Sequence, residues 1–186
     1  MQVNKQLSTY AFIDSQNLNL GIQRMGWKMD WRKFRQYLKK QHKVDRAYMF
    51  IGYMSDNEAL YEYMHELGYL IVLKPTIDVI NPDSKEDNSE EKDKITVKGN
   101  VDAEIVLYAM KELANYHKAI IVSGDGDFFS LIEYLDNIKK LGHIMVPNWQ
   151  YSSLLKQYES KIVRLDKLRK QLAYHDKNNS KIRRKP

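Results

Sequence analysis

The feature that most constrains this chain is a regular alternation of short apolar runs with segments of helical periodicity. Short apolar runs bounded by turn residues are typical of buried strands, and apolar residues that recur every three or four positions are typical of helices. The predicted strands are 10–13, 46–53, 69–74, 118–122, 143–146 and, as a small addition, 162–165. The predicted helices are 18–25, 31–42, 57–67, 101–115, 127–140, 151–158 and 167–174. This alternation predicts an α/β fold in three α/β/α layers around a mainly parallel sheet of five or six strands.

Carboxylates follow the predicted strands at the edge of the sheet where parallel sheets bind ligands. Ligands of such sheets lie outside the carboxyl ends of the strands. Asp14 follows the first strand, and Asp125 and Asp127 follow the strand at 118–122. Asp102 stands at the start of the next helix after the third strand. Carboxylates that converge at one edge repel each other, which raises their pKa values unless a cation relieves the repulsion.

Two interpretations of these aspartates stay open. Each one alone could be a helix N-cap, because a carboxylate accepts a hydrogen bond from the first turn. Together they suit Mg²⁺ or Mn²⁺, which take hard oxygen ligands and activate water against a phosphodiester. The candidate metal ligands and catalytic residues are Asp14, Asp102, Asp125 and Asp127. Asn17 follows Asp14 by three residues and could support a carboxylate, while Glu104 is expected to point away from the site.

Composition places the chain in a broad class. Its 186 residues suit one domain, and the absence of cysteine excludes disulfides and cysteine-ligated zinc. The five histidines have no metal-ligand spacing. The first residues are polar, and no apolar run approaches the roughly 18 residues that span a membrane. We therefore expect a cytoplasmic protein with no membrane partner.

Charge is distributed unevenly along the chain. The formal net charge is +6, and residues 161–186 hold ten Lys or Arg against two Asp. We divide the chain into a domain at 1–160 and a basic extension at 161–186 whose distal part is expected to be disordered. Such an extension indicates a polyanionic partner, or else only a solubilising end. Within the domain, 76–97 is acidic and is expected to form a long loop or a short excursion beside the sheet.

Three motifs resemble those of the NYN domain family, relatives of the PIN nucleases. Phe12-Ile13-Asp14-Ser15-Gln16-Asn17-Leu18 is similar to the opening motif of the family, and Ser123-Gly124-Asp125-Gly126-Asp127-Phe128 matches its SGDGDF motif. Lys98-Gly99-Asn100-Val101-Asp102 resembles its Lys-Gly-x-Asp segment, with one residue more before the aspartate. The motifs stand in the family's order, although the acidic segment before Lys98 has no counterpart in its core pattern.

The resemblance implies a PIN-like fold and a ribonuclease that depends on Mg²⁺ or Mn²⁺ and hydrolyses RNA, often single-stranded. It implies that Asp14, Asp102, Asp125 and Asp127 bind the metal and that Asn17 and Ser123 support them. Lys98 is a candidate for contacting a substrate phosphate, and the basic end supplies three more candidates. These are Lys181, Arg183 and Arg184.

Alternative functions stay open beside the ribonuclease. The family also includes regulatory proteins without clear catalytic activity, so one alternative is a module that binds RNA or a protein without cutting. Another is a nuclease that acts on structured DNA. Trp149 and Tyr151 follow the last main strand and either stack on bases or pack on the last helix. A homodimer is compatible with the tyrosine-rich composition (13 Tyr).

Overall fold

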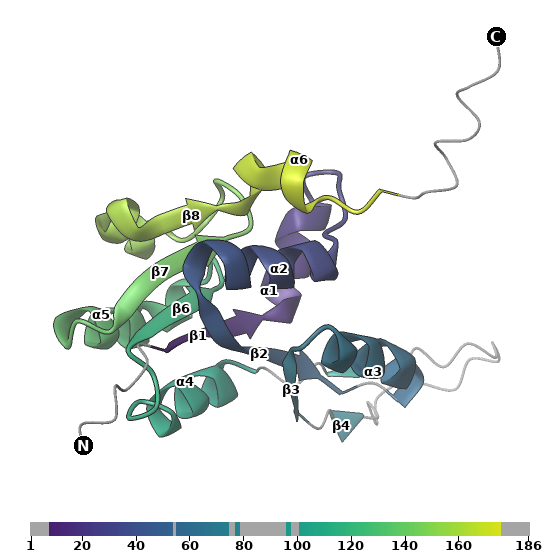
Figure 1. The fold of residues 1–186 in the computed structure, drawn as a ribbon, viewed down its shortest axis with the longest axis horizontal. Helices are drawn as coiled ribbons and strands as arrows, with labels where there is room; N and C mark the ends of the chain where they lie inside the picture. Colours follow the sequence, from purple (N-terminus) through teal and green to yellow (C-terminus); the bar gives the residue numbers. More distant parts are fainter. Residues whose placement is uncertain (1–7, 54, 75–76, 79–95, 98–100, 176–186) are drawn as a thin grey trace, which may run out of the picture.

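The computed structural model describes residues 8–53, 55–74, 77–78, 96–97 and 101–175 (Figure 1). Its central sheet has six strands in the order β3-β2-β1-β6-β7-β8, and every neighbouring pair is parallel. The strands are β1 (Thr9–Asp14), β2 (Val44–Gly52), β3 (Leu70–Lys74), β6 (Lys118–Val122), β7 (Leu141–Val146) and β8 (Ile162–Arg164). The predicted α/β fold with a parallel sheet is confirmed, including the small sixth strand.

Helices cover both faces of this sheet and complete the three layers (Figure 1). The helices are α1 (Ser15–Gln23), α2 (Trp31–His42), α3 (Glu58–Glu66), α4 (Asp102–Lys111), α5 (Phe129–Asn137) and α6 (Arg169–Leu172). The described residues also form four 3-10 segments: η1 (Ser55–Asn57), η2 (Gly126–Phe128), η3 (Ser153–Lys161) and η4 (Leu165–Leu168). The helix expected at 151–158 is therefore 3-10 and lies further along the chain. Within the described part of the chain, no helix is long and apolar enough to cross a membrane.

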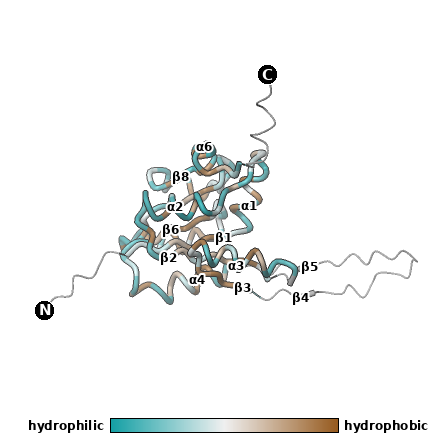
Figure 2. Tube along the Cα trace, turned by 45° about the vertical axis from the view of Figure 1, so that its right-hand side comes forward, coloured by the Kyte–Doolittle hydropathy of each residue, from teal (hydrophilic) through white to brown (hydrophobic). Residues whose placement is uncertain are grey.

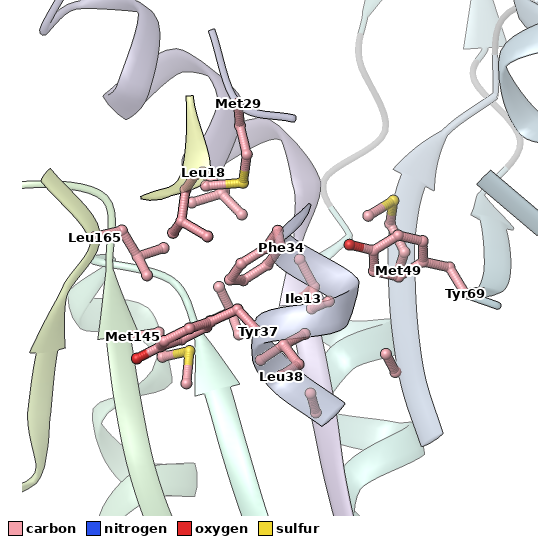
Figure 3. Close-up of a cluster of buried hydrophobic side chains, with 14 of the residues drawn as sticks. Ile13, Leu18, Met29, Phe34, Tyr37, Leu38, Met49, Tyr69, Met145 and Leu165 are labelled. Carbon is pink, nitrogen blue, oxygen red and sulfur yellow. The ribbon is translucent and has the colours of Figure 1, made fainter. Parts of the chain in front are cut away.

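Two hydrophobic cores lie against opposite faces of the sheet. One is formed by α1, α2 and α6 with side chains such as Ile13, Phe34 and Met145 (Figure 3). The other packs α4 and α5 against the reverse face, where Phe12 stacks on Tyr48 with ring centroids 5.6 Å apart. Figure 2 shows that the hydrophobic residues gather on the strands between the helices. Adjacent residues of one strand therefore enter different cores, as expected for a sheet buried on both faces.

Side-chain caps explain where the first two helices begin. The Asp30 carboxylate accepts a hydrogen bond from the backbone N–H of Lys33 at 3.1 Å and caps α2. Asp14 caps α1 in the same way, through the N–H of Asn17 at 3.0 Å. Because this cap sits at the end of β1, α1 starts three residues earlier than its apolar periodicity predicts. Strand and helix are thus joined without a loop at Asp14.

The acidic segment is bracketed by a short pairing outside the main sheet. β4 (Ile77–Asp78) and β5 (Thr96–Val97) form a two-stranded antiparallel sheet in which Ile77 lies opposite Val97. The expected excursion beside the sheet therefore occurs at its two ends. The residues from 79 to 95 lie outside the described residues.

The strand order reverses direction at β1, and this reversal positions the candidate site. From β1 the chain passes to β2 and β3 on one side and later crosses back to β6 on the other. In open parallel sheets, the crevice at the carboxyl ends of the two strands beside such a reversal is the usual ligand site. Asp14 ends β1, and Ser123 directly follows β6. Asp14 and Ser123, both singled out from the sequence, thus lie on the two sides of the reversal.

Candidate functional site

Asp14 is the buried centre of the site, with 5% of its surface exposed. One carboxylate oxygen accepts the capping hydrogen bond from Asn17, and the other accepts a hydrogen bond from the Ser123 hydroxyl at 3.2 Å. Each carboxylate oxygen has a second lone pair, so both retain acceptor capacity after these bonds. The carboxylate is therefore held in a fixed orientation while it remains able to bind another donor or a cation.

Two polar side chains tie the end of β1 to the loop after β6. The Ser123 hydroxyl donates to Asp14 and accepts a hydrogen bond from the backbone N–H of Asp125 at 3.2 Å. The side-chain oxygen of Asn17 accepts a hydrogen bond from the N–H of Gly124 at 2.9 Å. Asn17 and Ser123 therefore connect the two segments that carry the carboxylates, and small shifts of one segment must move the other.

The electrostatics of Asp14 reflect its burial first and the neighbouring carboxylates second. Burial raises the pKa of its carboxyl above the usual value, and the nearby carboxylates of Asp102 and Asp125 raise it further. The hydrogen bonds from Asn17 and Ser123 act in the opposite direction without cancelling the effect. The ionised form of Asp14 is therefore disfavoured until a positive charge enters the site.

The four candidate ligands differ in exposure and in local role. Asp102 is the first residue of α4 and is half-buried, and Asp125 is half-buried and caps η2 through the N–H of Asp127 at 3.1 Å. Asp127 itself is exposed. The N-cap interpretation thus applies to Asp14 and Asp125, whereas side-chain capping is not the role of Asp102, because α4 has no side-chain cap.

A hard divalent cation requires oxygen ligands, and the candidate ligands here are the carboxylates around Asp14. Among the described residues, no three or more His, Cys, Asp or Glu side chains already form a group that could hold a metal ion. The chemistry nevertheless fits, because three carboxylates interact electrostatically at Asp14 and carboxylate oxygen is the ligand type that Mg²⁺ and Mn²⁺ prefer. Mg²⁺ usually keeps several waters and needs only one or two carboxylates of the protein.

Several predicted substrate contacts fall outside the described residues. These are Lys98, Lys181, Arg183 and Arg184. A different lysine is described at the same edge of the sheet: Lys74, the last residue of β3, forms an ion pair with Glu104 at 3.0 Å. Glu104 therefore links α4 to β3.

The end of β7 adds polar residues that the sequence interpretation did not include. The buried Asn148 donates a hydrogen bond to the carbonyl of Gly21 at 2.8 Å and accepts one from the N–H of Gln150 at 2.7 Å. A cavity of about 120 Å³ lies beside it and also contacts Asn17 and Arg24. The signal was available, because Asn148 follows an apolar strand much as Asp14 does, but no role in the site was assigned to it.

The two aromatic residues after β7 have different environments. The Trp149 side chain is 56% exposed, whereas Tyr151 is half-buried and packs against the core on the α4 and α5 face. Trp149 is therefore free to contact a ligand at this edge, and Tyr151 is occupied by packing.

Comparisons with known proteins give the family of this chain and a related fold. The family model described as the NYN domain matches residues 8–181. The protein LabA (low amplitude and bright) of Synechococcus elongatus is 27% identical over 128 residues, which make up 67% of this chain and 65% of that protein. The chain thus spans just under two thirds of that relative's length. The crystal structure of VPA0982, a protein of unknown function from Vibrio parahaemolyticus, matches with a TM-score of 0.67 and 22% identity, covering 94% of this chain and 100% of that one. At this identity the likeness concerns the fold alone.

Proposed function

The chain belongs to the NYN domain family, and from this premise we propose that it is a metal-dependent ribonuclease acting at the carboxyl ends of β1 and β6. One observation carries the proposal: the buried Asp14 carboxylate, with a pKa raised by burial and by Asp102 and Asp125, at the reversal of strand order. A structural cap gains nothing from two further carboxylates nearby. A metal ligand does, because a divalent cation favours all three in their ionised form.

The proposed ligands of Mg²⁺ or Mn²⁺ are Asp14, Asp102, Asp125 and Asp127. When bound, such an ion lowers the pKa of a bound water and stabilises the charge that develops on a phosphodiester. Asp14 supplies the fixed, buried carboxylate, and Asn17 and Ser123 maintain its orientation toward the loop of Asp125. Asp127 supplies the most exposed of the four carboxylates.

The surroundings of the cluster support a polynucleotide substrate. Arg24 and Gln150 contact the cavity beside Asn17, where they can donate hydrogen bonds to a backbone phosphate. The exposed Trp149 ring can stack on a base of a single strand, a contact that tolerates any sequence. Lys98 and the basic residues Lys181, Arg183 and Arg184 complete the proposed phosphate contacts. We also keep the division into a domain at 1–160 and a basic extension at 161–186 as a proposal.

One observation favours a second candidate function. Because no group of three metal-binding side chains is already formed among the described residues, the fold could bind RNA without cutting it. In that case the carboxylates repel the RNA backbone and contribute nothing to binding. Removing one of them would then leave the affinity for RNA unchanged or raise it.

Cleavage of labelled single-stranded RNA and of the matching DNA, with Mn²⁺, Mg²⁺ or EDTA, tests the proposal. We expect the wild-type protein to cut RNA only with a divalent ion, and Asp125→Asn to reduce cutting by about 10²-fold or more, the scale of a lost metal contact. The matched control is Asp30→Asn, which removes an equivalent capping carboxylate from α2, one that is not among the groups that shift the pKa of Asp14.

Each outcome of this assay separates the candidates. Equal cutting by the wild type and Asp125→Asn would contradict the proposed site and indicate a contaminating nuclease. RNA binding without any cutting would favour the binding module, and preferential cutting of DNA would favour the nuclease acting on DNA.

A further inference from the structure

A second, basic cavity lies at the opposite edge of the sheet, around the amino ends of the strands. Its volume is about 480 Å³. Its wall includes residues at or just before the starts of five strands: Thr9 of β1, Lys43 before β2, Lys118 of β6, Leu141, Gly142 and His143 of β7, and Lys161 before β8. The strands separate this cavity from the carboxylate cluster by roughly 15–20 Å, since a strand rises about 3.3 Å per residue.

Positive charge dominates the polar wall of the cavity. Lys43, Lys118 and Lys161 belong to three different segments that the fold brings to the cavity wall. Lys118 donates one hydrogen bond to the carbonyl of Lys139 at 2.8 Å, and Lys161 forms an ion pair with Asp136. Each ammonium group has three N–H donors, so one bond to the protein leaves donors for a ligand.

The two histidines of the wall add an uncommon feature. The rings of His42 and His143 lie 4.8 Å apart, and the Nε2 atom of His42 is 3.1 Å from the Tyr37 hydroxyl. The Nδ1 atom of His143 is buried and has no hydrogen-bond partner among the described residues. A buried polar atom without a hydrogen-bond partner is costly. Because this atom is buried, a ligand in the cavity reaches it only if the His143 ring turns.

Negative groups near the cavity are too few to neutralise the wall. Asp136 is the partner of Lys161, and Asp45 accepts a hydrogen bond from the backbone of Thr9 at 3.3 Å. The described residues of the wall itself include three lysines and no Asp or Glu. Burial and the neighbouring His143 lower the pKa of His42, so the charged form of His42 is disfavoured until an anion enters.

We propose that this cavity binds a small organic phosphate, with the phosphate group against the lysines and His143. A doubly charged oxyanion suits a wall that includes three lysines. The volume lies within the range of about 300–1,000 Å³ typical of small-molecule sites and exceeds what one phosphate group fills. The remaining space is bounded by the apolar side chains of Ile120 and Leu141 and by the imidazole rings, which suit the organic part. This site is independent of the proposed nuclease activity.

The test follows the imidazole signals of His42 and His143 by NMR while ribose 5-phosphate, inorganic phosphate, ribose or sodium chloride is added at constant ionic strength. His42→Gln and His143→Gln assign the signals. We expect saturable shifts with ribose 5-phosphate at millimolar concentration or below, weaker binding of inorganic phosphate, and no saturation with ribose or chloride. The double substitution Lys43→Gln/Lys118→Gln should weaken the affinity by about tenfold or more, because two charge-assisted contacts are lost.

The matched control is Lys111→Gln/Lys156→Gln, which removes the same charge from two exposed positions outside the cavity wall. Its affinity should equal that of the wild type, and melting curves should show that both double variants are folded. Short RNAs with a 5′-phosphate or a 5′-hydroxyl identify the source of the phosphate: saturation by the phosphorylated RNA alone would assign the cavity to RNA ends. Shifts that rise linearly, or that persist unchanged in Lys43→Gln/Lys118→Gln, would overturn the proposal.

Discussion

An Asp14→Asn protein is expected to lose about 10³-fold in RNA cleavage and, without divalent metal, to melt about 2–4 °C above the wild type. The loss of cleavage follows because a bound ion contributes several kcal/mol to phosphodiester hydrolysis, and each 1.36 kcal/mol corresponds to about tenfold in rate. Asn is as good an N-cap as Asp, so the start of α1 is preserved. The measurements are initial cleavage rates with Mn²⁺ and melting temperatures in EDTA.

The gain in stability follows from the raised pKa of Asp14. Burial and the nearby carboxylates of Asp102 and Asp125 raise this pKa in the folded protein. In the unfolded chain, this aspartate has the ordinary pKa of about 3.9. As the pH rises from about 3.9 toward the raised pKa of the folded protein, the unfolded chain loses this proton first, and the folded wild type loses stability. The advantage of Asn is therefore fully present at neutral pH and shrinks toward pH 4. A gain of about 1 kcal/mol in the free energy of unfolding corresponds to roughly 2–4 °C in melting temperature for a protein of this size.

Metal should reverse the order of the two melting temperatures. A ligand at 100 times its dissociation constant stabilises the folded state by about 2.7 kcal/mol, so saturating Mn²⁺ should raise the wild type above Asp14→Asn. Asp30→Asn is the control, because Asp30 caps α2 as Asp14 caps α1 but is not among the carboxylates that act on Asp14. It should show neither the gain in EDTA nor the loss of cleavage. A lower melting temperature of Asp14→Asn in EDTA would mean that Asp14 serves the fold and not the site.

A Gly21→Ala protein is expected to be destabilised by about 2–3 kcal/mol, which corresponds to roughly 4–12 °C in melting temperature. A Cβ atom at position 21 would lie 2.4 Å from Cγ and 2.6 Å from Cβ of Pro147, and the proline ring cannot rotate away. Alanine stabilises a helix by about 1 kcal/mol relative to glycine. The measured loss in the free energy of unfolding is therefore smaller than the cost of the clash alone. Displacement of Pro147 would also move Asn148, whose hydrogen bond ends on the Gly21 carbonyl.

Two comparisons isolate this contact. Asn19→Ala changes an exposed neighbour on α1 and should alter the melting temperature by no more than about 2 °C, in line with the small effects of surface substitutions. In a Pro147→Gly background, the same Gly21→Ala change should lower the free energy of unfolding much less, because the ring atoms that the added Cβ would meet are absent. An equal cost in both backgrounds would show that α1 and the β7 loop do not press on each other as described.

Local sequence patterns were sufficient to predict the strands of the main sheet. Apolar runs identified the six strands of the main sheet, and the rule that ligands bind at the carboxyl ends of parallel strands led to Asp14 and Asp125. The order of the strands was not predictable, because it depends on which edge each crossover reaches and not on any local pattern. The start of α1 was predicted at 18 because apolar periodicity does not report a cap supplied by a strand residue.

Features built from distant residues could not be read from the sequence. The bridge from Ser123 to Asp14 joins positions 109 residues apart. The basic cavity combines single residues that stand before different strands, so the histidines at 42 and 143 showed no spacing that signals a site. Asn148 could have been found, since the strand-end rule applies to amides as well as acids. The two-residue strands β4 and β5 are too short to leave a periodic pattern.

The most direct test of the central claim is Mn²⁺ binding itself, measured by the electron paramagnetic resonance signal of free Mn²⁺ in titrations of wild type, Asp14→Asn and Asp30→Asn without RNA. If the carboxylates around Asp14 form a metal site, wild type and Asp30→Asn will bind Mn²⁺ with the same affinity, and Asp14→Asn will bind it at least about tenfold more weakly. If all three proteins bind Mn²⁺ equally, or none binds it at millimolar concentrations, the strand-end carboxylates do not form the metal site of a nuclease.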